Sequence, residues 1–277
     1  MSRARMLGAA GAALGFSIAA AQAADLSVIQ PPFVPAVEEY TGWYLRGSVG
    51  MTNQQVRSLA LEPLPAAFSG ETITTPFLGF ASSPLFGVGV GFQVNNWLRF
   101  DGTAEYRGAA SFHGQQVESQ GGVTLPDDYT ALKSEWLFLA NAFVDFGTWW
   151  GVTPFVGAGI GGSINTISNF MDQGATQSGA TILSTTYFDN YSKTNFAWAL
   201  YAGLSYHVTP AVSLELMYRY VSLGDAQTGA PHAFDGSPLP GSSPFVFHDL
   251  TSNDVMLGVR WMLGAPIAPP PPLTSRG

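Results

Sequence analysis

The stretch Leu98-Arg99-Phe100-Asp101-Gly102-Thr103-Ala104-Glu105-Tyr106-Arg107 decides the fold class, because its side chains alternate between two kinds. Every second residue from Leu98 is apolar or small, and the residues between them carry four charges and one threonine. In an extended strand, successive side chains point to opposite faces. The alternation therefore predicts a β-strand with one apolar face and one charged face.

The same period of two recurs along the chain and predicts eight strands, near 42–51, 85–94, 97–107, 135–146, 152–163, 195–207, 212–221 and 253–263. The region from Glu135 to Ser163 is apolar enough to suggest a membrane helix, but its glycines and Pro154 disfavour one. It divides better into two strands that turn at Gly147–Gly151. The predicted connections are alternately short and long, and the long ones cover 52–84, 108–134, 164–194 and 222–252.

The composition excludes several classes of protein. Only 11% of the 277 residues are charged, 13% are aromatic, cysteine is absent and the formal net charge is −8. An absence of cysteine excludes a disulfide scaffold, the aromatic content excludes a disordered acidic chain, and the charge disfavours nucleic-acid binding.

Strands of about ten residues with turns short on one side and long on the other are typical of bacterial outer-membrane barrels. We therefore predict an all-β, eight-stranded, antiparallel, up-and-down transmembrane β-barrel with short periplasmic turns and four long extracellular loops.

A soluble eight-stranded barrel of the lipocalin type is the alternative fold, since alternation alone does not say which face points inward. Aromatic residues near the strand ends, such as Trp43, Trp136 and Trp261, favour a membrane with interfacial girdles. The polar face is also too sparse in charge for a soluble surface. The membrane barrel is the preferred interpretation.

The two ends of the chain have different compositions from the barrel. Arg3 and Arg5 precede an apolar run, and Ala21-Gln22-Ala23 follows it as a cleavage site, so residues 1–23 are predicted to be a signal peptide. Residues 24–41 are predicted to be a proline-rich periplasmic linker, 42–263 the barrel and 264–277 a proline-rich periplasmic tail. An even number of strands places both termini in the periplasm if the N-terminus lies there.

If the apolar face meets lipid, eleven charged residues point into the lumen. A barrel of eight strands has an interior that side chains can fill, and buried charges there are tolerated when they are paired. The primary interpretation is a plug of ion pairs, and the alternative is a polar path for small solutes. The predicted network consists of Arg46, Arg99, Asp101, Glu105, Arg107, Glu135, Asp145, Glu215, Arg219, Asp254 and Arg260, with Lys133 and Lys193 outside it near loop ends.

Four stretches resemble the small alpha-proteobacterial outer-membrane barrels, a family that includes major surface antigens and haemin-binding proteins of Rhizobiales-type bacteria. They are Tyr40–Gly50, Arg99–Arg107, Thr153–Gly161 and Ser252–Arg260. The resemblance implies a porin-family barrel in the outer membrane of a Gram-negative bacterium. The chain departs from the family at its last strand, which ends Trp261-Met262-Leu263 and is followed by the tail, whereas family members usually end on an aromatic residue.

The resemblance also suggests two attachments. Some relatives are joined covalently to peptidoglycan through a mature Ala-Asp terminus, which corresponds here to Ala24. Haemin-binding relatives suggest that the loop histidines His113, His232 and His248 ligate haem or a metal, although solvated loop histidines are the simpler interpretation.

The function predicted from the sequence is structural: the barrel supports envelope integrity and presents its loops at the cell surface. No catalytic constellation is evident, so we expect neither an enzyme nor a cofactor. Expected partners are outer-membrane lipid, lipopolysaccharide and the barrel-assembly machinery during biogenesis, with peptidoglycan as a further candidate. A small-solute pore and a surface protein that binds haemin or another ligand remain as alternatives.

Overall fold

Eight antiparallel strands close into a barrel in the computed structural model, which describes residues 41–64, 72–120, 123–177 and 181–264. Each strand pairs with its neighbours along the chain, and the first pairs with the last, so the predicted eight-stranded up-and-down barrel is confirmed. The eight strands are β1 (Gly42–Gln55), β4 (Ser83–Gln93), β5 (Leu98–Gln120), β6 (Val123–Asp145), β7 (Val152–Gln177), β9 (Tyr191–His207), β10 (Val212–Gln227) and β12 (Phe245–Met262).

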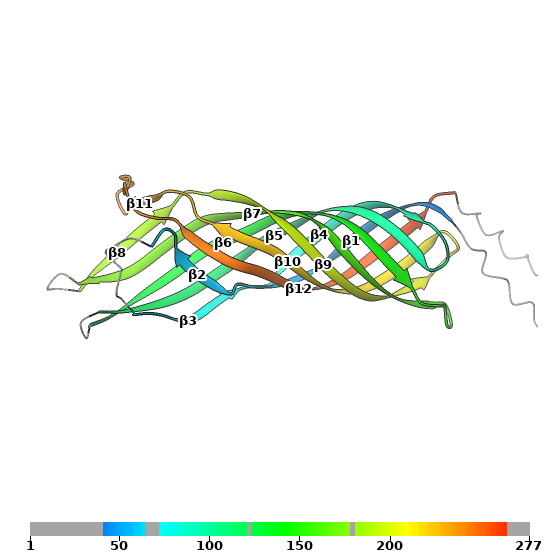
Figure 1. Ribbon diagram of the computed structural model, residues 1–277, viewed down its shortest axis with the longest axis horizontal. Coiled ribbons are helices and arrows are strands. Elements are labelled where there is room, and N and C mark those ends of the chain that lie inside the picture. Colours follow the sequence, from blue (N-terminus) through cyan, green and yellow to red (C-terminus); the bar gives the residue numbers. More distant parts are fainter. Residues whose placement is uncertain (1–40, 65–71, 121–122, 178–180, 265–277) are drawn as a thin grey trace, which may run out of the picture. The chain divides into compact units, whose positions relative to one another are not determined.

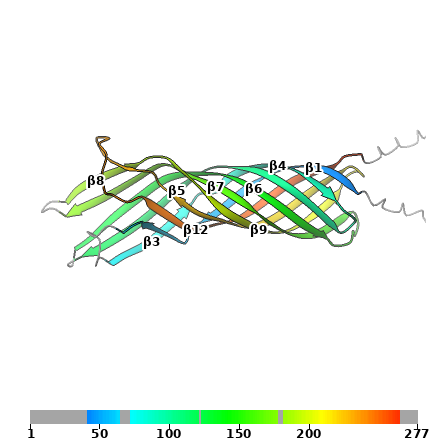
Figure 2. The same cartoon turned by 45° about the horizontal axis from the view of Figure 1, so that its top comes forward.

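Four shorter strands extend the wall at one end of the barrel, which we call the hairpin end. They are β2 (Ser58–Leu61), β3 (Thr72–Phe80), β8 (Thr181–Phe188) and β11 (Pro231–Ala233). β2 pairs with β12, β3 with β5, β8 with β7, and β11 with β8. β1 begins and β12 ends at the opposite end, which we call the terminal end (Figure 1, Figure 2).

The terminal end carries three short connections, at 94–97, 146–151 and 208–211. In the second, the backbone groups of Trp149 and Val152 bond each other in both directions, at 2.9 and 3.0 Å. The two residues between them, Trp150 and Gly151, have φ angles of 52° and 81°. Two positive φ angles define a type I′ turn, which matches the twist of the strands that it joins.

The two faces of each strand separate as the alternation predicts. In β5, Phe100 and Tyr106 are 46% and 40% exposed on the outside, whereas Arg99 and Arg107 are completely buried in the lumen. Strands β1, β4, β9, β10 and β12 follow the same rule, and their outer side chains are mostly Val, Leu, Phe, Tyr and Trp. The barrel is therefore apolar outside and charged inside, the reverse of a lipocalin. None of the described residues forms a helix long and apolar enough to span a bilayer.

The expected long loops are largely strands, which corrects the sequence interpretation. β5 and β6 each run for 23 residues and β7 for 26. Bulges hide this continuity: the register of β5 against β6 shifts between Arg107 and Ala110, so the inward residues change from odd to even numbers. Asn169 in β7 and Asp249 in β12 interrupt their strands with φ angles of 51° and 52°. Beyond each of these irregularities, alternate residues again point into the lumen, but with the opposite parity.

Several predictions concern segments outside the described residues. They are the signal peptide at 1–23 with Ala24, the linker up to residue 40 and the tail from residue 265.

Candidate functional site

The lumen near the terminal end holds six charged side chains, which we call the terminal-end cluster: Arg46, Arg99, Asp101, Asp145, Glu215 and Arg260. Glu215 lies at its centre, because Oε1 accepts hydrogen bonds from Arg99 at 3.1 Å and from Arg260 at 3.0 Å. Arg46 donates to Asp101 at 3.0 Å. Arg99 donates through Nε to both oxygens of Asp145, each at 3.2 Å. Three cations and three anions thus neutralise one another.

Aromatic rings complete the surroundings of the terminal-end cluster. The Arg99 guanidinium lies 4.4 Å from the ring centroid of Phe143 and 4.6 Å from that of Phe155. A guanidinium that is only weakly hydrated stacks favourably on such rings. Arg99 therefore combines ion pairs to Asp145 and Glu215 with packing against two aromatic rings, while its Nη2 has no hydrogen-bond partner among the described residues.

A second set of charges, the mid-barrel cluster, lies further from the terminal end: Glu105, Arg107, Lys133, Glu135, Arg219 and Asp254. Arg219 donates to Glu105 through two nitrogens and to Asp254 through Nε at 2.9 Å. Arg107 makes a bidentate pair with Asp254, at 2.8 and 3.0 Å, and contacts Glu135. Bidentate pairs of this kind fix the orientation of the guanidinium as well as neutralising its charge.

Lys133 was expected outside the network, and the structure corrects this. Its side chain is fully buried, its ammonium contacts Glu135, and it donates to Gln54 Oε1 at 2.8 Å. Lys133 lies on the inward face of β6, two residues before Glu135, so the alternation could have placed it there. Lys193, in contrast, pairs with Asp225 at 3.3 Å and stays about one-third exposed. With Lys133 included, the mid-barrel cluster also balances three cations against three anions.

Tyr201 and Asn141 connect the two clusters. The Tyr201 hydroxyl donates to Asn141 Oδ1 at 2.9 Å, and Asn141 Nδ2 donates to Asp101 Oδ1 at 2.7 Å. The Tyr201 ring lies 5.8 Å from the Arg219 guanidinium. All eleven residues of the predicted network therefore lie in one of two clusters that a short chain of polar side chains joins.

Beyond the mid-barrel cluster, toward the hairpin end, the lumen is filled by aromatic rings, which the sequence analysis missed. Phe170 is the centre of this aromatic cluster, with ring centroids 5.1 Å from both Phe188 and Phe245 and 5.9 Å from Phe247. The connected rings are Phe80, Phe112, Tyr129, Phe170, Phe188, Phe245 and Phe247. They come from β3, β5, β6, β7, β8 and β12, so the rings meet across the lumen. The spacing of Phe245 and Phe247, two residues apart, was the sequence signal that could have revealed an inward-facing strand here, but this segment was interpreted as a loop.

The three loop histidines lie on different strands. His113 is exposed on the outer face of β5. His232 lies 3.1 Å from Asp189 and His248 lies 3.0 Å from Glu62, each through Nε2. Over the described ranges, no three or more His, Asp or Glu residues are grouped so that they could hold a metal ion. Haem ligation by these residues stays a prediction.

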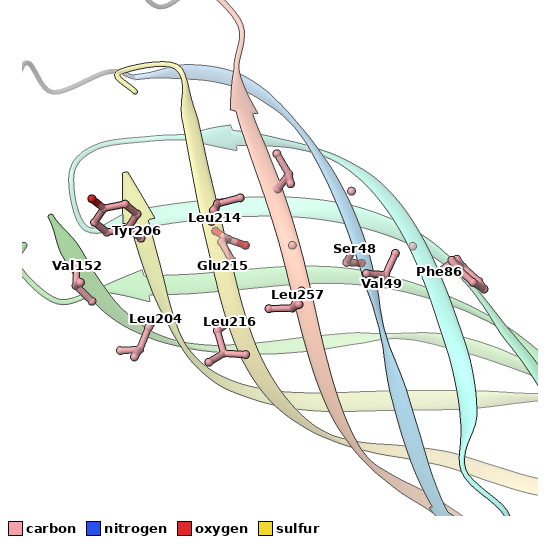
Figure 3. Close-up of a pocket in the computed structure, with 14 residues that line it drawn as sticks. Ser48, Val49, Phe86, Val152, Leu204, Tyr206, Leu214, Glu215, Leu216 and Leu257 are labelled. Atoms are coloured by element: carbon pink, nitrogen blue, oxygen red, sulfur yellow. The ribbon is translucent and has the colours of Figure 1, made fainter. Parts of the chain in front are cut away.

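The outer face has a shallow apolar depression near the terminal end, with a volume of about 760 Å³. Figure 3 shows that outward side chains of several strands border it, among them Val49, Leu257, Leu216 and Leu204. The Glu215 carboxylate belongs to the lumen, where it is completely buried. The lining of the depression is almost entirely apolar.

Known proteins resemble this chain over most of its length. The family model described as outer membrane protein beta-barrel domain matches residues 9–261. An uncharacterised protein of Brucella suis biovar 1 (strain 1330) is 32% identical over 221 residues, which cover 74% of this chain and 76% of the relative. Among solved structures, neisserial surface protein A is 18% identical with a TM-score of 0.39, and covers 81% of this chain and 99% of its own. OprG of Pseudomonas aeruginosa is 13% identical with a TM-score of 0.42, and covers 81% and 98%.

The extent of the family match, the identity to the Brucella relative and the barrel with an apolar outer face agree with one another. The chain therefore belongs to the outer membrane protein β-barrel domain family.

Proposed function

We propose that the protein is a closed, non-conducting barrel that strengthens the outer membrane and presents its long hairpins at the cell surface. The observation that carries this proposal is the filling of the lumen. The two charged clusters and the aromatic cluster follow one another along the barrel, and their charged side chains are at most 6% exposed.

Each layer opposes solute passage for a physical reason. An ion crossing the charged clusters would have to displace arginine–carboxylate pairs that are bonded at 2.5–3.2 Å. A polar solute crossing the aromatic cluster would have to leave water for an apolar region without compensating hydrogen bonds, which costs several kcal/mol. The polar lumen is thus better suited to holding the barrel wall together than to conducting.

The proposal includes an orientation and a set of partners. The terminal end faces the periplasm and the hairpin end faces the outside, where it meets lipopolysaccharide. Outer-membrane lipid covers the apolar wall, and the barrel-assembly machinery inserts it. Attachment to peptidoglycan through Ala24 is a further part of this proposal, and mass spectrometry of lysozyme-released muropeptides tests it: a free Ala24 amine in every fragment refutes it.

Planar-bilayer recording of the refolded full-length protein tests the closed lumen. Insertion is first verified by heat-modifiable migration in gels, and a general porin reconstituted in the same way serves as the positive control. We expect no single-channel steps from the wild-type protein. Stable, reproducible steps would establish the alternative, a small-solute pore.

A surface-binding role for haemin is tested separately, by titration of haemin against the wild type and against the triple variant His113→Ala/His232→Ala/His248→Ala. The proposal of a purely structural barrel expects no shift of the Soret band in either protein. A Soret shift in the wild type that the triple variant lacks supports the haemin-binding alternative.

A further inference from the structure

The barrel wall is interrupted between β9 and β10 toward the hairpin end. These strands pair as far as Ser222 and Trp198. Beyond that point, side chains bond the backbone of β10: Asn165 of β7 donates to the Leu223 carbonyl at 2.8 Å, and Asn195 of β9 donates to the Asp225 carbonyl at 2.7 Å. β10 therefore separates from β9 while it stays paired with β12 as far as Gln227, and the chain then continues into β11, which pairs with β8.

A pocket of about 470 Å³ lies where β10 ends at Gln227 and the chain continues toward β11. It is bordered by Tyr191 at the start of β9, by the segment 227–232 that leads into β11, and by the loop 238–244. This volume is in the range of small-molecule sites. Tyr191 is 45% exposed at the rim, whereas Thr228 is completely buried and forms part of the floor.

The pocket has a rigid frame. Leu239 N donates to the Pro231 carbonyl at 3.2 Å, which ties the loop to β11, and Gly229 N donates to the Asp189 carbonyl at 2.9 Å. Phe245 N donates to Thr228 Oγ1 at 3.0 Å, which ties the floor to β12. Four prolines in the lining (Pro231, Pro238, Pro240 and Pro244) fix their own φ angles. A frame of this kind loses little conformational entropy when a ligand binds.

The lining selects the chemistry of the ligand. It is mostly apolar, with a tyrosine ring and proline rings that suit the face of a flat ring. The described residues that border the pocket include no lysine, arginine or carboxylate, so they offer an anion no arginine or lysine as a counter-charge. The Asp189 carboxylate, which is 63% exposed, lies beside the lining, 3.1 Å from His232 Nε2. A carboxylate at the rim favours a cationic group on the ligand.

We propose that this pocket binds a small, water-soluble aromatic amine, with its ring against Tyr191 and the prolines and its ammonium toward Asp189. This site is separate from the lumen and does not depend on whether the lumen is closed. It adds recognition of a small molecule to the surface hairpins.

Cysteine protection tests the proposal, because the chain has no cysteine of its own. The variant Ser242→Cys places a thiol in the lining, and Ser58→Cys places one on exposed β2 outside the pocket. Full-length protein in nanodiscs of zwitterionic lipid is alkylated with N-ethylmaleimide, with tryptamine as the probe. A ligand of this size is expected to bind with a Kd of about 1 mM, so about 10 mM tryptamine should slow alkylation of the Ser242→Cys thiol about tenfold.

Matched comparisons decide the outcome. We expect tryptamine to leave the Ser58→Cys thiol unprotected. Indole-3-acetate, which has the same ring but an anionic group, should protect the Ser242→Cys thiol little. Adding Tyr191→Ala to Ser242→Cys should abolish protection by tryptamine. Phe234→Ala is the matched control, since Phe234 is 79% exposed in the neighbouring loop and does not border the pocket. The proposal is overturned if tryptamine protects neither thiol or both, or if indole-3-acetate protects the Ser242→Cys thiol equally well. It is also overturned if Tyr191→Ala and Phe234→Ala behave alike, or if maltose, added as a sugar probe, protects the Ser242→Cys thiol where tryptamine does not.

Discussion

Replacement of Arg219 by methionine should strongly destabilise the barrel, because Arg219 neutralises two buried carboxylates at once. Its guanidinium donates to Glu105 at 2.5 and 3.0 Å and to Asp254 at 2.7 and 2.9 Å. Methionine fills similar space without donors. Asp254 keeps its bidentate pair with Arg107, but Glu105 keeps only a contact with Arg107 at 3.8 Å.

The magnitude follows from this imbalance. The mid-barrel cluster changes from three cations and three anions to two and three, and the uncompensated charge falls on Glu105, whose side chain is 3% exposed. Removal of one partner from a buried pair costs about 3–5 kcal/mol. The double variant Arg219→Met/Glu105→Gln restores the balance at two and two, so we expect it to recover about 2 kcal/mol of that loss.

Equilibrium unfolding in lipid vesicles by guanidinium chloride, followed by tryptophan fluorescence, measures these free energies of unfolding. The matched control is Arg57→Met, which breaks the pair of Arg57 with Asp249 at 3.0 Å, where the side chains are 78% and 60% exposed. That change should cost less than about 1 kcal/mol. The reasoning is refuted if Arg219→Met costs no more than Arg57→Met, or if adding Glu105→Gln deepens the loss.

Three further predictions concern regions outside the charged lumen, and the same unfolding assay checks them. Phe170→Ala should cost about 3–5 kcal/mol because it empties the centre of the aromatic cluster, whereas Phe234→Ala at an exposed site should cost little, and equal losses would contradict a packed cluster. Burial, followed by the nearby Asp127 carboxylate, raises the pKa of Asp172 to about 7. Since the folded state then binds the proton more tightly than the unfolded state, the free energy of unfolding should fall as the pH rises from about 4 to 7, and Asp172→Asn should weaken this fall; an unchanged pH profile in Asp172→Asn refutes the assignment. Trp150→Asn should raise the free energy of unfolding by about 0.5–1 kcal/mol, because asparagine tolerates the φ of 52° better, and a loss of stability would mean that contacts of the indole outweigh the backbone strain.

Alternation along the sequence was sufficient to predict the eight barrel strands, because the information that it needs is local. In Leu98–Arg107, each side chain's face follows from its parity, and burial in the structure agrees at Arg99, Phe100, Tyr106 and Arg107. Parity also assigns the eleven lumen charges to one face. The parity rule fails in β5 after Arg107, because a bulge between Arg107 and Ala110 changes the inward-facing residues from odd to even numbers. The extension of β5 to Gln120 was therefore interpreted as a loop.

The partners inside the lumen could not be predicted in the same way. Arg107 meets Asp254 at a sequence separation of 147 residues, and Arg219 meets Glu105 at 114. Such pairs depend on the stagger between strands around the closed barrel, which no single strand encodes. The aromatic cluster has the same origin, because Phe112, Phe170 and Phe247 become neighbours only when β5, β7 and β12 face one another.

The sequence by itself determined the eight barrel strands and divided each of them into an apolar and a polar face, since a strand exposes alternate residues to opposite sides whatever its neighbours are. Only the tertiary structure decided that Lys133 completes a neutral mid-barrel cluster, that the hairpins enclose an aromatic cluster, and that β10 leaves β9 beside a proline-lined pocket. These features arise from register, bulges and closure. They bring together residues that are far apart in the chain, and the stagger of the whole barrel sets their distances.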